Sequence, residues 1–268
     1  MFNVKDLLSI GEFSKYSGIP GGTLRYWEDI GLFIPAKRDP KSNYRYYRPE
    51  QIIAVNCIRV LSSLNIKLQE ISRVEKIRNP ELVLELIAKH EKELEISAKQ
   101  IRESFDIINT RRELIRRGLN ADPSNIKVQR LPEEHYIIGT RNIFQWDTTF
   151  YSAFRTFCEK AEEYHINLSY PIGGMHGSME EFLKAPGEPN YFFSVDPHGT
   201  EKMPEGLYMV GYAKGYYGNL GDLPERMAEH AKVHNLKCEG PLYVIYLLDE
   251  VCILDPDQYL AQVCIAIS

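Results

Sequence analysis

The longest uninterrupted helical pattern in the chain runs from Glu81 to Arg117, a stretch without proline or glycine. Aliphatic residues recur at every seventh position along it, which is the period of a coiled-coil seam. At 1.5 Å per residue such a helix extends over about 55 Å, too far for one small domain to cover. We therefore expect it to pair with a second copy of the chain. The seam residues are Ile87, Leu94, Ile101, Ile108 and Ile115.

The form of this pairing depends on a second, companion seam. It alternates apolar Ala98 and Phe105 with charged Glu91 and Arg112. Because a tight parallel zipper needs two apolar seams, the mixture favours an antiparallel pair. The alternative is one amphipathic helix packed on its own domain. Residues 118–123 end the helix and begin a linker.

Charge is divided unevenly along the chain, although the whole carries a net charge of only −5. Residues 1–80 hold 13 basic and 8 acidic side chains, residues 81–118 hold eight of each, and residues 119–268 hold 11 and 21. A basic head on an acidic body suggests that the head meets a polyanion and the body does not. Because 44% of the residues are hydrophobic, the composition excludes a wholly disordered chain.

Residues 9–35 are predicted to form two short helices around a tight turn. Ser9 can cap the first helix, and Glu12 three residues later completes a capping box. The sequence Gly-Ile-Pro-Gly-Gly over 18–22 ends this helix, and a second is expected over 23–29. Two short helices around a glycine turn are the minimal helix-turn-helix.

A short hairpin is expected directly after these helices. Asp-Pro-Lys-Ser-Asn over 39–43 is a turn signal, and the flanking residues 33–34 and 44–47 suit strands. A hairpin in this place is the wing of a winged helix-turn-helix. Further helices are predicted over 50–64 and 68–77.

The second helix and the wing together carry the side chains that docking to DNA requires. Thr23, Arg25 and Tyr26 lie in the first turn of the second helix, where a recognition helix faces the major groove. Arg25 can donate two hydrogen bonds to a phosphate or a guanine. The alternative for the aromatic residues is the core of a small domain, and we assign Leu24 and Trp27 to that core. In the wing, donors and aromatic rings alternate at Asn43, Tyr44, Arg45 and Tyr46.

The run SIGEFSKYSGI, followed by TLRYWEDIGLFIP and NYRYYRPEQI, resembles the N-terminal signature of MerR-family transcriptional regulators. The resemblance implies a winged helix-turn-helix, a homodimer through a long antiparallel helix, and a palindromic promoter with an overlong spacer. In that family an activated dimer bends and untwists promoter DNA so that RNA polymerase can engage both promoter elements. The family's DNA-contacting places fall on Lys15, Thr23, Arg25, Tyr26, Tyr44 and Arg45.

The signature departs from the family pattern at the start of the second helix. Pro20 stands where a capping serine or threonine is usual, and Gly21 and Gly22 follow it where better helix formers are usual. We therefore expect the start of this helix to fray.

Cysteine placement argues against a metal site. Metal-sensing members of the family carry cysteines at the end of the dimer helix, whereas residues 116–120 contain neither cysteine nor histidine. The five cysteines of the chain are far apart and include no C-x-x-C pair, so we expect buried thiols and neither a metal nor another cofactor.

Beyond residue 125 the pattern changes to short strands with two helices. Helices are predicted over 148–164 and 224–234. The order strands, helix, strands occurs twice, which predicts a duplicated α+β domain with both helices on one side of an antiparallel sheet. Strands are expected over 126–131, 136–140, 191–195, 206–217, 242–248 and 258–267.

This body resembles the GyrI-like effector-binding domain of BmrR-like multidrug regulators, through its strand and helix order and the runs PEGLYMVGYAKG and GPLYVIYLLDE. The resemblance implies a pocket for bulky aromatic, often cationic, small molecules. An acidic body rich in tyrosine fits such ligands, since aromatic faces attract cations and carboxylates balance them. The alternative for each tyrosine is ordinary sheet packing. The candidate ligand-binding residues are Phe144, Trp146, Tyr151, Tyr170, Tyr208, Tyr212 and Tyr246.

The body departs from the GyrI-like pattern at Val244, where a glutamate commonly meets the charge of the ligand. Three explanations remain open: another acid takes this role, cation–π contact suffices, or the ligand is less charged. The acids that could replace the glutamate are Glu133, Glu134, Asp147 and Glu181.

These patterns divide the chain into a DNA-binding domain over 1–78, a dimerisation helix with linker over 79–120, and an effector-binding domain over 121–268. We expect a cytoplasmic regulator, because no apolar run is long enough for a membrane span and the first residues lack the pattern of a signal peptide. The expected partners are promoter DNA, RNA polymerase, an aromatic effector and a second copy of the chain. We expect no catalysis. The alternatives are a hydrolase using His176, His198 or Glu181, and a domain that binds another protein.

Overall fold

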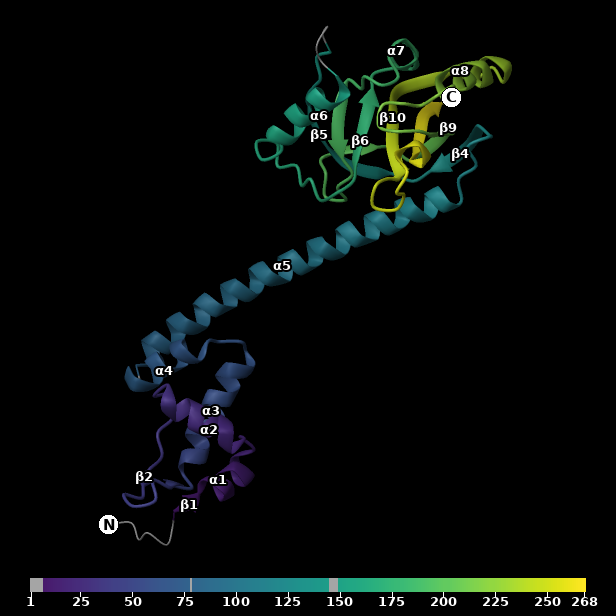
Figure 1. Cartoon of the computed structure of the whole chain (residues 1–268). Coiled ribbons are helices and arrows are strands. Elements are labelled where there is room, and N and C mark those ends of the chain that lie inside the picture. Colours follow the sequence, from purple (N-terminus) through teal and green to yellow (C-terminus); the bar gives the residue numbers. More distant parts are fainter. Residues whose placement is uncertain (1–6, 78, 145–148) are drawn as a thin grey trace. The chain divides into compact units, whose positions relative to one another are not determined.

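The computed structural model describes residues 7–77, 79–144 and 149–268 (Figure 1). The chain forms two compact units, Met1–Gln100 and Ile101–Ser268. Their boundary falls inside the long helix α5 (Pro80–Leu119), so each part of this helix belongs to the unit that it contacts. The division into three domains stays a prediction.

The N-terminal unit begins with the expected pair of short helices, α1 (Ile10–Ser17) and α2 (Gly21–Asp29). The capping box is confirmed: the Glu12 amide donates to the Ser9 Oγ at 3.2 Å, and the Ser9 amide donates to the Glu12 carboxylate at 2.8 Å. Helix α2 begins two residues earlier than expected and has no side-chain cap at Pro20.

The wing and the two following helices are also confirmed, but the first strand of the wing lies at Lys37–Arg38 and not at 33–34 as expected. Strand β3 (Arg45–Tyr47) pairs antiparallel with β2 (Lys37–Arg38) and with a short strand β1 (Leu8–Ser9), which was not predicted. The Asp39 carboxylate accepts two backbone amides and so fixes the turn between β2 and β3. Helices α3 (Gln51–Ser63) and α4 (Leu68–Ile77) follow.

Aromatic rings fill the core of this unit. Phe13 stacks on Tyr47 with ring centroids 4.6 Å apart, and Phe33 stacks on both. Leu24 and Trp27 are buried beside them, as expected. Helix α2 is therefore held by one face, and its other face stays accessible.

Helix α5 is slightly longer than predicted. Its seam residues Ile87, Leu94, Ile101 and Ile108 are all exposed in the single chain, and Ile115 is half-buried. Among the described residues, no helix combines the length and the apolar character that a membrane crossing needs.

In its described part, the C-terminal unit holds an eight-stranded sheet in the order β4-β9-β11-β10-β6-β7-β5-β8. Every neighbouring pair is antiparallel. Six strands match the prediction, and β6 and β8 were missed. The strands are β4 (Lys127–Leu131), β5 (Glu134–Arg141), β6 (Ile172–His176), β7 (Tyr191–Ser194), β8 (Glu201–Met203), β9 (Gly206–Lys214), β10 (Cys238–Leu248) and β11 (Leu260–Ile267).

Helices α6 (Phe150–Glu159) and α8 (Leu223–Val233) lie on the same face of this sheet, as expected. Phe192 and Val244 both pair with Gly174, so their side chains share one face. Phe192 packs in the cluster of α6, and Val244 packs in the cluster of α8. A third helix, α7 (Met179–Lys184), and a 3-10 turn, Pro256–Gln258, complete the unit, and α6 ends five residues earlier than predicted.

The opposite face of the sheet packs against the last turns of α5. Leu114 is buried there among Phe193, Tyr243 and neighbouring side chains. A Cβ on Gly118 would lie 2.7 Å from Leu248 Cγ, so the helix approaches β10 more closely than any larger residue would allow. One face of the sheet therefore carries α6 and α8, and the other carries α5.

Candidate functional site

The exposed face of α2 presents the residues predicted to meet DNA. Arg25 and Tyr26 point away from the core, between the buried Leu24 and Trp27. Thr23 is half-buried, and Lys15 on α1 is exposed. This alternation follows from the helical period, so the two core residues determine which side chains face outward.

The wing adds two exposed residues to this surface. Asn43 adopts a left-handed backbone with φ of 56° and accepts a hydrogen bond from Arg38 at 3.0 Å. Tyr44 is exposed, and its ring lies 5.4 Å from that of half-buried Tyr46.

Arg45 has a partner inside the unit. Its Nε donates to Glu28 Oε2 at 2.5 Å, and Arg38 Nε donates to Glu28 Oε1 at 2.8 Å. The hydrogen bond from Arg38 is the main cause that holds the pKa of Glu28 below its usual value. Arg45 therefore ties the wing to α2, and its contact with DNA stays a prediction.

The C-terminal unit contains a cavity of about 300 Å³ on the face of the sheet that α6 and α8 cover. Its floor is Gly173-Gly174 of β6, where no side chain fills the space between the two helix clusters. A Cβ on Gly174 would lie 2.9 Å from Pro189, and one on Gly173 would lie 2.3 Å from the Phe193 ring on the other face. Only glycine fits at these two positions without a shift of neighbours.

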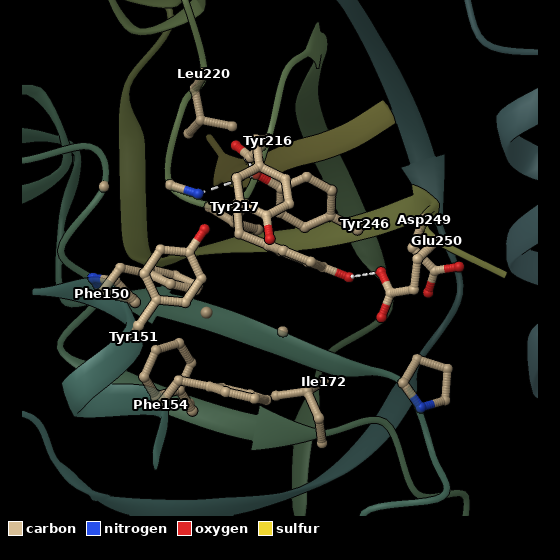
Figure 2. A pocket seen from close by; sticks show the side chains of 18 of the residues that line it. Phe150, Tyr151, Phe154, Ile172, Tyr216, Tyr217, Leu220, Tyr246, Asp249 and Glu250 are labelled. Atoms are coloured by element: carbon tan, nitrogen blue, oxygen red, sulfur yellow. Dashed lines mark hydrogen bonds between the residues drawn. The ribbon is translucent and has the colours of Figure 1, made fainter. Parts of the chain in front are cut away.

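Aromatic rings form the walls of this cavity (Figure 2). Phe150, Tyr151 and Phe154 come from the first turns of α6. Tyr216 and Tyr217 come from the loop after β9. Tyr246 comes from β10, and its ring lies 4.5 Å from that of Tyr217, while the rings of Phe150 and Tyr217 stack at 6.2 Å.

The phenol groups at the cavity are neutral donors at physiological pH. Burial raises the pKa of Tyr151 to about 12 and raises the pKa of Tyr246 further. The Tyr246 hydroxyl donates to the Tyr216 carbonyl at 3.0 Å and accepts from the Gly218 amide at 3.2 Å. These two bonds fix the orientation of the ring.

Three charged side chains line the cavity in the described part of the chain: Arg111, Asp249 and Glu250. Glu250 accepts a hydrogen bond of 2.5 Å from the Tyr217 hydroxyl (Figure 2), and Asp249 pairs with Arg111 at 3.3 Å. His176 also lines the cavity, and burial lowers its pKa to about 4, so it is neutral. Together these side chains carry one net negative charge.

The structure brings three of the predicted ligand-binding residues to the cavity: Tyr151, Tyr170 and Tyr246. Tyr208 and Tyr212 lie on the opposite face of the sheet, where the Tyr208 hydroxyl donates to the Pro204 carbonyl at 2.8 Å. Phe144 packs in the cluster of α6 without lining the cavity. Trp146 and Asp147 lie outside the described residues.

Four acids were considered as substitutes for the glutamate that is missing at Val244. Three of them have partners elsewhere in the unit. Glu133 binds Lys202, Glu134 binds Arg117, and Glu181 accepts the Gly177 amide. Val244 does line the cavity. Sequence reasoning missed Phe150, Phe154, Tyr216, Tyr217, Asp249 and Glu250.

The described residues contain no group of three or more histidine, cysteine, aspartate or glutamate side chains arranged to hold a metal ion. The cysteines are free, with Cys57 and Cys252 exposed. The expectation that all five thiols are buried was therefore wrong for these two, Cys158 and Cys238 are half-buried, and Cys264 is buried.

A protein-family model described as "MerR HTH family regulatory protein" matches residues 8–76. An uncharacterised HTH-type transcriptional regulator of Pseudomonas aeruginosa is 30% identical over 113 residues, which cover 40% of this chain and 83% of that protein. This chain belongs to the MerR family. Its first unit is accordingly the DNA-binding part of a transcriptional regulator.

Two further relatives of this MerR-family chain are known regulators in Bacillus subtilis. The multidrug-efflux transporter 2 regulator is 26% identical over 256 residues, covering 94% of this chain and 93% of the relative. The multidrug-efflux transporter 1 regulator is 33% identical over 101 residues, covering 38% and 34%. These relatives regulate transcription, and the MerR-family chain is a transcriptional regulator rather than an enzyme.

Among solved structures, the EcmrR–DNA complex in EcmrR-RPo matches with a TM-score of 0.42 and 17% identity, covering 97% of this chain and 99% of that one.

Proposed function

We propose that this regulator activates transcription as a homodimer on a palindromic promoter, distorting an overlong spacer when its C-terminal, GyrI-like unit binds a bulky aromatic cation. The observation that carries the proposal is the cavity in that unit, which combines aromatic walls with one net negative charge. Its relatives include multidrug-efflux regulators, which also supports a small-molecule ligand for this unit.

Cation binding is supported by the chemistry of the walls. The aromatic side chains that line the cavity offer cation–π contact, which is worth about 2 kcal/mol when the cation is desolvated. Glu250 lines the cavity, where a carboxylate can balance the charge of a ligand. The volume of about 300 Å³ lies at the lower end of ordinary ligand pockets.

Dimerisation is supported by the unpartnered seam of α5. Leu94, Ile101 and Ile108 present about half of their surface to solvent in the single chain. A regular row of exposed aliphatic residues on one helix face marks a surface that another helix covers. Pairing with an antiparallel partner would relate the two copies of α2 and the wing by a two-fold axis. A palindromic DNA site has the same symmetry.

Control of transcription is then a shift between dimer conformations. A ligand that binds one conformation more tightly raises its population, and the promoter takes the twist that this conformation imposes. The partners are promoter DNA and RNA polymerase, and the place of action is the cytoplasm.

The first test measures ligand binding by calorimetry with two compounds of similar shape, cationic methyltriphenylphosphonium and neutral triphenylphosphine oxide. We expect the cation to bind at least ten-fold more tightly to the full-length protein. Glu250→Gln should remove most of this difference, whereas Glu159→Gln on the outer surface of α6 should not. Equal affinities for both compounds would contradict the proposal.

The second test is transcription in vitro on the upstream region of the protein's own gene. Methyltriphenylphosphonium should raise the transcript level while a footprint shows unchanged promoter occupancy. Transcription that rises only in parallel with occupancy would argue for recruitment instead of DNA distortion.

A further inference from the structure

The cavity wall contains a cation of the protein itself. Arg111 projects from α5 and is the one lysine or arginine among the described residues that line the cavity. Its guanidinium pairs with Asp249 at 3.3 Å, with one third of the Arg111 side chain and one sixth of the Asp249 side chain exposed. The pair is therefore partly shielded from solvent, and its charges act on any occupant of the cavity.

Arg111 changes the number of carboxylates that a ligand can use. Asp249 is balanced by Arg111, while the neighbouring Glu250 accepts a hydrogen bond from the uncharged hydroxyl of Tyr217 and is paired with no cation among the described residues. A hydroxyl donor carries no net charge, so Glu250 keeps its full negative charge for an occupant. Without Arg111 the same wall would offer two uncompensated carboxylates next to each other in the sequence.

We propose that Arg111 selects the charge of the ligand, so that the cavity takes aromatic monocations and discriminates against dications. This inference rests on the proposed function of the cavity. A monocation is balanced by Glu250 alone. A dication needs Asp249 as well, and its second positive charge must either lie beside Arg111 or displace it.

Displacement is restricted because the backbone around Arg111 is fixed. Other contacts hold this part of α5 to the sheet: Glu103 accepts from Asn167 at 2.6 Å, Asp106 pairs with His198 at 3.1 Å, and Arg117 donates to Gln262 at 2.9 Å. None of these six residues lines the cavity. The helix therefore stays in place when the ion pair of Arg111 is lost, and an uncharged residue at 111 leaves the unit folded.

The experiment compares two rigid cations of nearly equal shape by calorimetry on the full-length protein. The monocation is 1-methyl-4-phenylpyridinium, and the dication is 1,1′-dimethyl-4,4′-bipyridinium. We expect the wild-type chain to bind the monocation about ten-fold more tightly. In Arg111→Met the dication should gain about ten-fold and the monocation about three-fold or less, so that the preference largely disappears.

Arg155→Met is the matched control. It also removes a guanidinium paired with a carboxylate, Glu159 at 3.3 Å, but on the exposed side of α6. Because net charge changes equally in both variants, only Arg111→Met should alter the ratio of the two affinities. Circular dichroism and melting of each variant confirm that it is folded.

Two results would overturn the inference, and they are distinguishable. If both cations bind but Arg111→Met leaves their ratio unchanged, charge selection by Arg111 is wrong while the proposed function stands. If neither cation binds the wild-type chain, the proposed function fails and the inference fails with it.

Discussion

At the scale of residues, the contacts of Glu28 distinguish the arginines that stabilise the DNA-binding unit from those that are free to contact DNA. It accepts Arg38 and Arg45 of the wing at once, and only a tenth of its side chain is exposed. Charge-assisted bonds of this kind are stronger than neutral ones. Arg45 thus stabilises the hairpin, whereas exposed Arg25 is available for phosphate or base contacts.

Substitution of Arg25 and of Arg45 should have different effects on DNA binding and on stability. Arg25→Ala should weaken promoter binding about ten-fold and lower the slope of affinity against salt concentration by about one, with little change in stability. Arg45→Ala should lower the free energy of unfolding by about 1–2 kcal/mol because it leaves Glu28 with a single partner. Urea titration and mobility shifts measure both effects. Equal losses of stability would contradict this assignment.

His176 predicts a dependence of stability on pH. Burial is the main cause that lowers its pKa to about 4, while the charge of Glu181 and a hydrogen bond with the Pro186 backbone act in the opposite direction with smaller effect. The unfolded chain therefore binds a proton between about pH 6.5 and 4 that the folded chain excludes. This contribution to stability is complete above pH 6.5 and is lost as the pH falls towards 4.

Between pH 7 and pH 5, the wild-type chain should lose about 2 kcal/mol more unfolding free energy than His176→Gln. Denaturant titrations at the two pH values give this difference even if the variant is less stable at both. The same substitution at exposed His234 is the control. Identical pH dependence in wild type and His176→Gln would show that burial of this ring is not linked to protonation.

At the scale of elements, α5 presents two different surfaces. Its last turns bury Leu114 and Gly118 against the sheet, while its seam stays exposed along the preceding turns. The sequence predicted the seam from its seven-residue period. It did not predict the close contact at Gly118, because that glycine was interpreted only as the end of the helix.

The seam can be tested by charge. Leu94→Asp should shift the protein from dimer to monomer at micromolar concentration, because two buried carboxylates at a helix pair are costly. Lys99→Asp, five residues further along and off the seam, should leave the dimer intact. Analytical ultracentrifugation measures both. A wild-type chain that sediments as a monomer would rule out this interface.

The fold was largely predictable from local signals, and the cavity was only partly so. Caps, breakers and apolar periods predicted every described helix except α7, and six strands of the sheet. Strand β6 was missed because Gly173-Gly174 interrupts the alternation that identifies a strand. Those same glycines form the floor of the cavity, so the feature that creates the site also concealed it.

The ligand-binding tyrosines show the same limit. Tyr208 and Tyr212 lie in β9 with a spacing of four, which places both on one face, and that face proved to be the one packed against α5. The strand was predicted to continue to 217 but ends at Lys214. Tyr216 and Tyr217 therefore lie in a loop that turns to the other face, which a strand pattern cannot predict.

At the scale of the whole molecule, the two units should respond to different ligands. A cation at one hundred times its dissociation constant should stabilise the unit that binds it by about 2.7 kcal/mol. We expect methyltriphenylphosphonium to raise the melting temperature of the transition assigned to residues 101–268, and Glu250→Gln to reduce this shift to about half. Promoter DNA should stabilise residues 1–100 instead. A cation that stabilised the N-terminal unit would place its site outside the cavity.

The glycine floor has a consequence for the range of compounds that the regulator can detect. In most domains the middle of such a layer is closed by aliphatic side chains of fixed shape. Here the missing side chain of Gly174 leaves it open and flanked by flat rings. Ring faces require no hydrogen bond from what lies between them, so guests of different outline can pack against them. The range of ligands that this regulator binds then depends on incomplete packing of its interior. Mutations that fill the gap should reduce the number of compounds that bind before they reduce the stability of the fold.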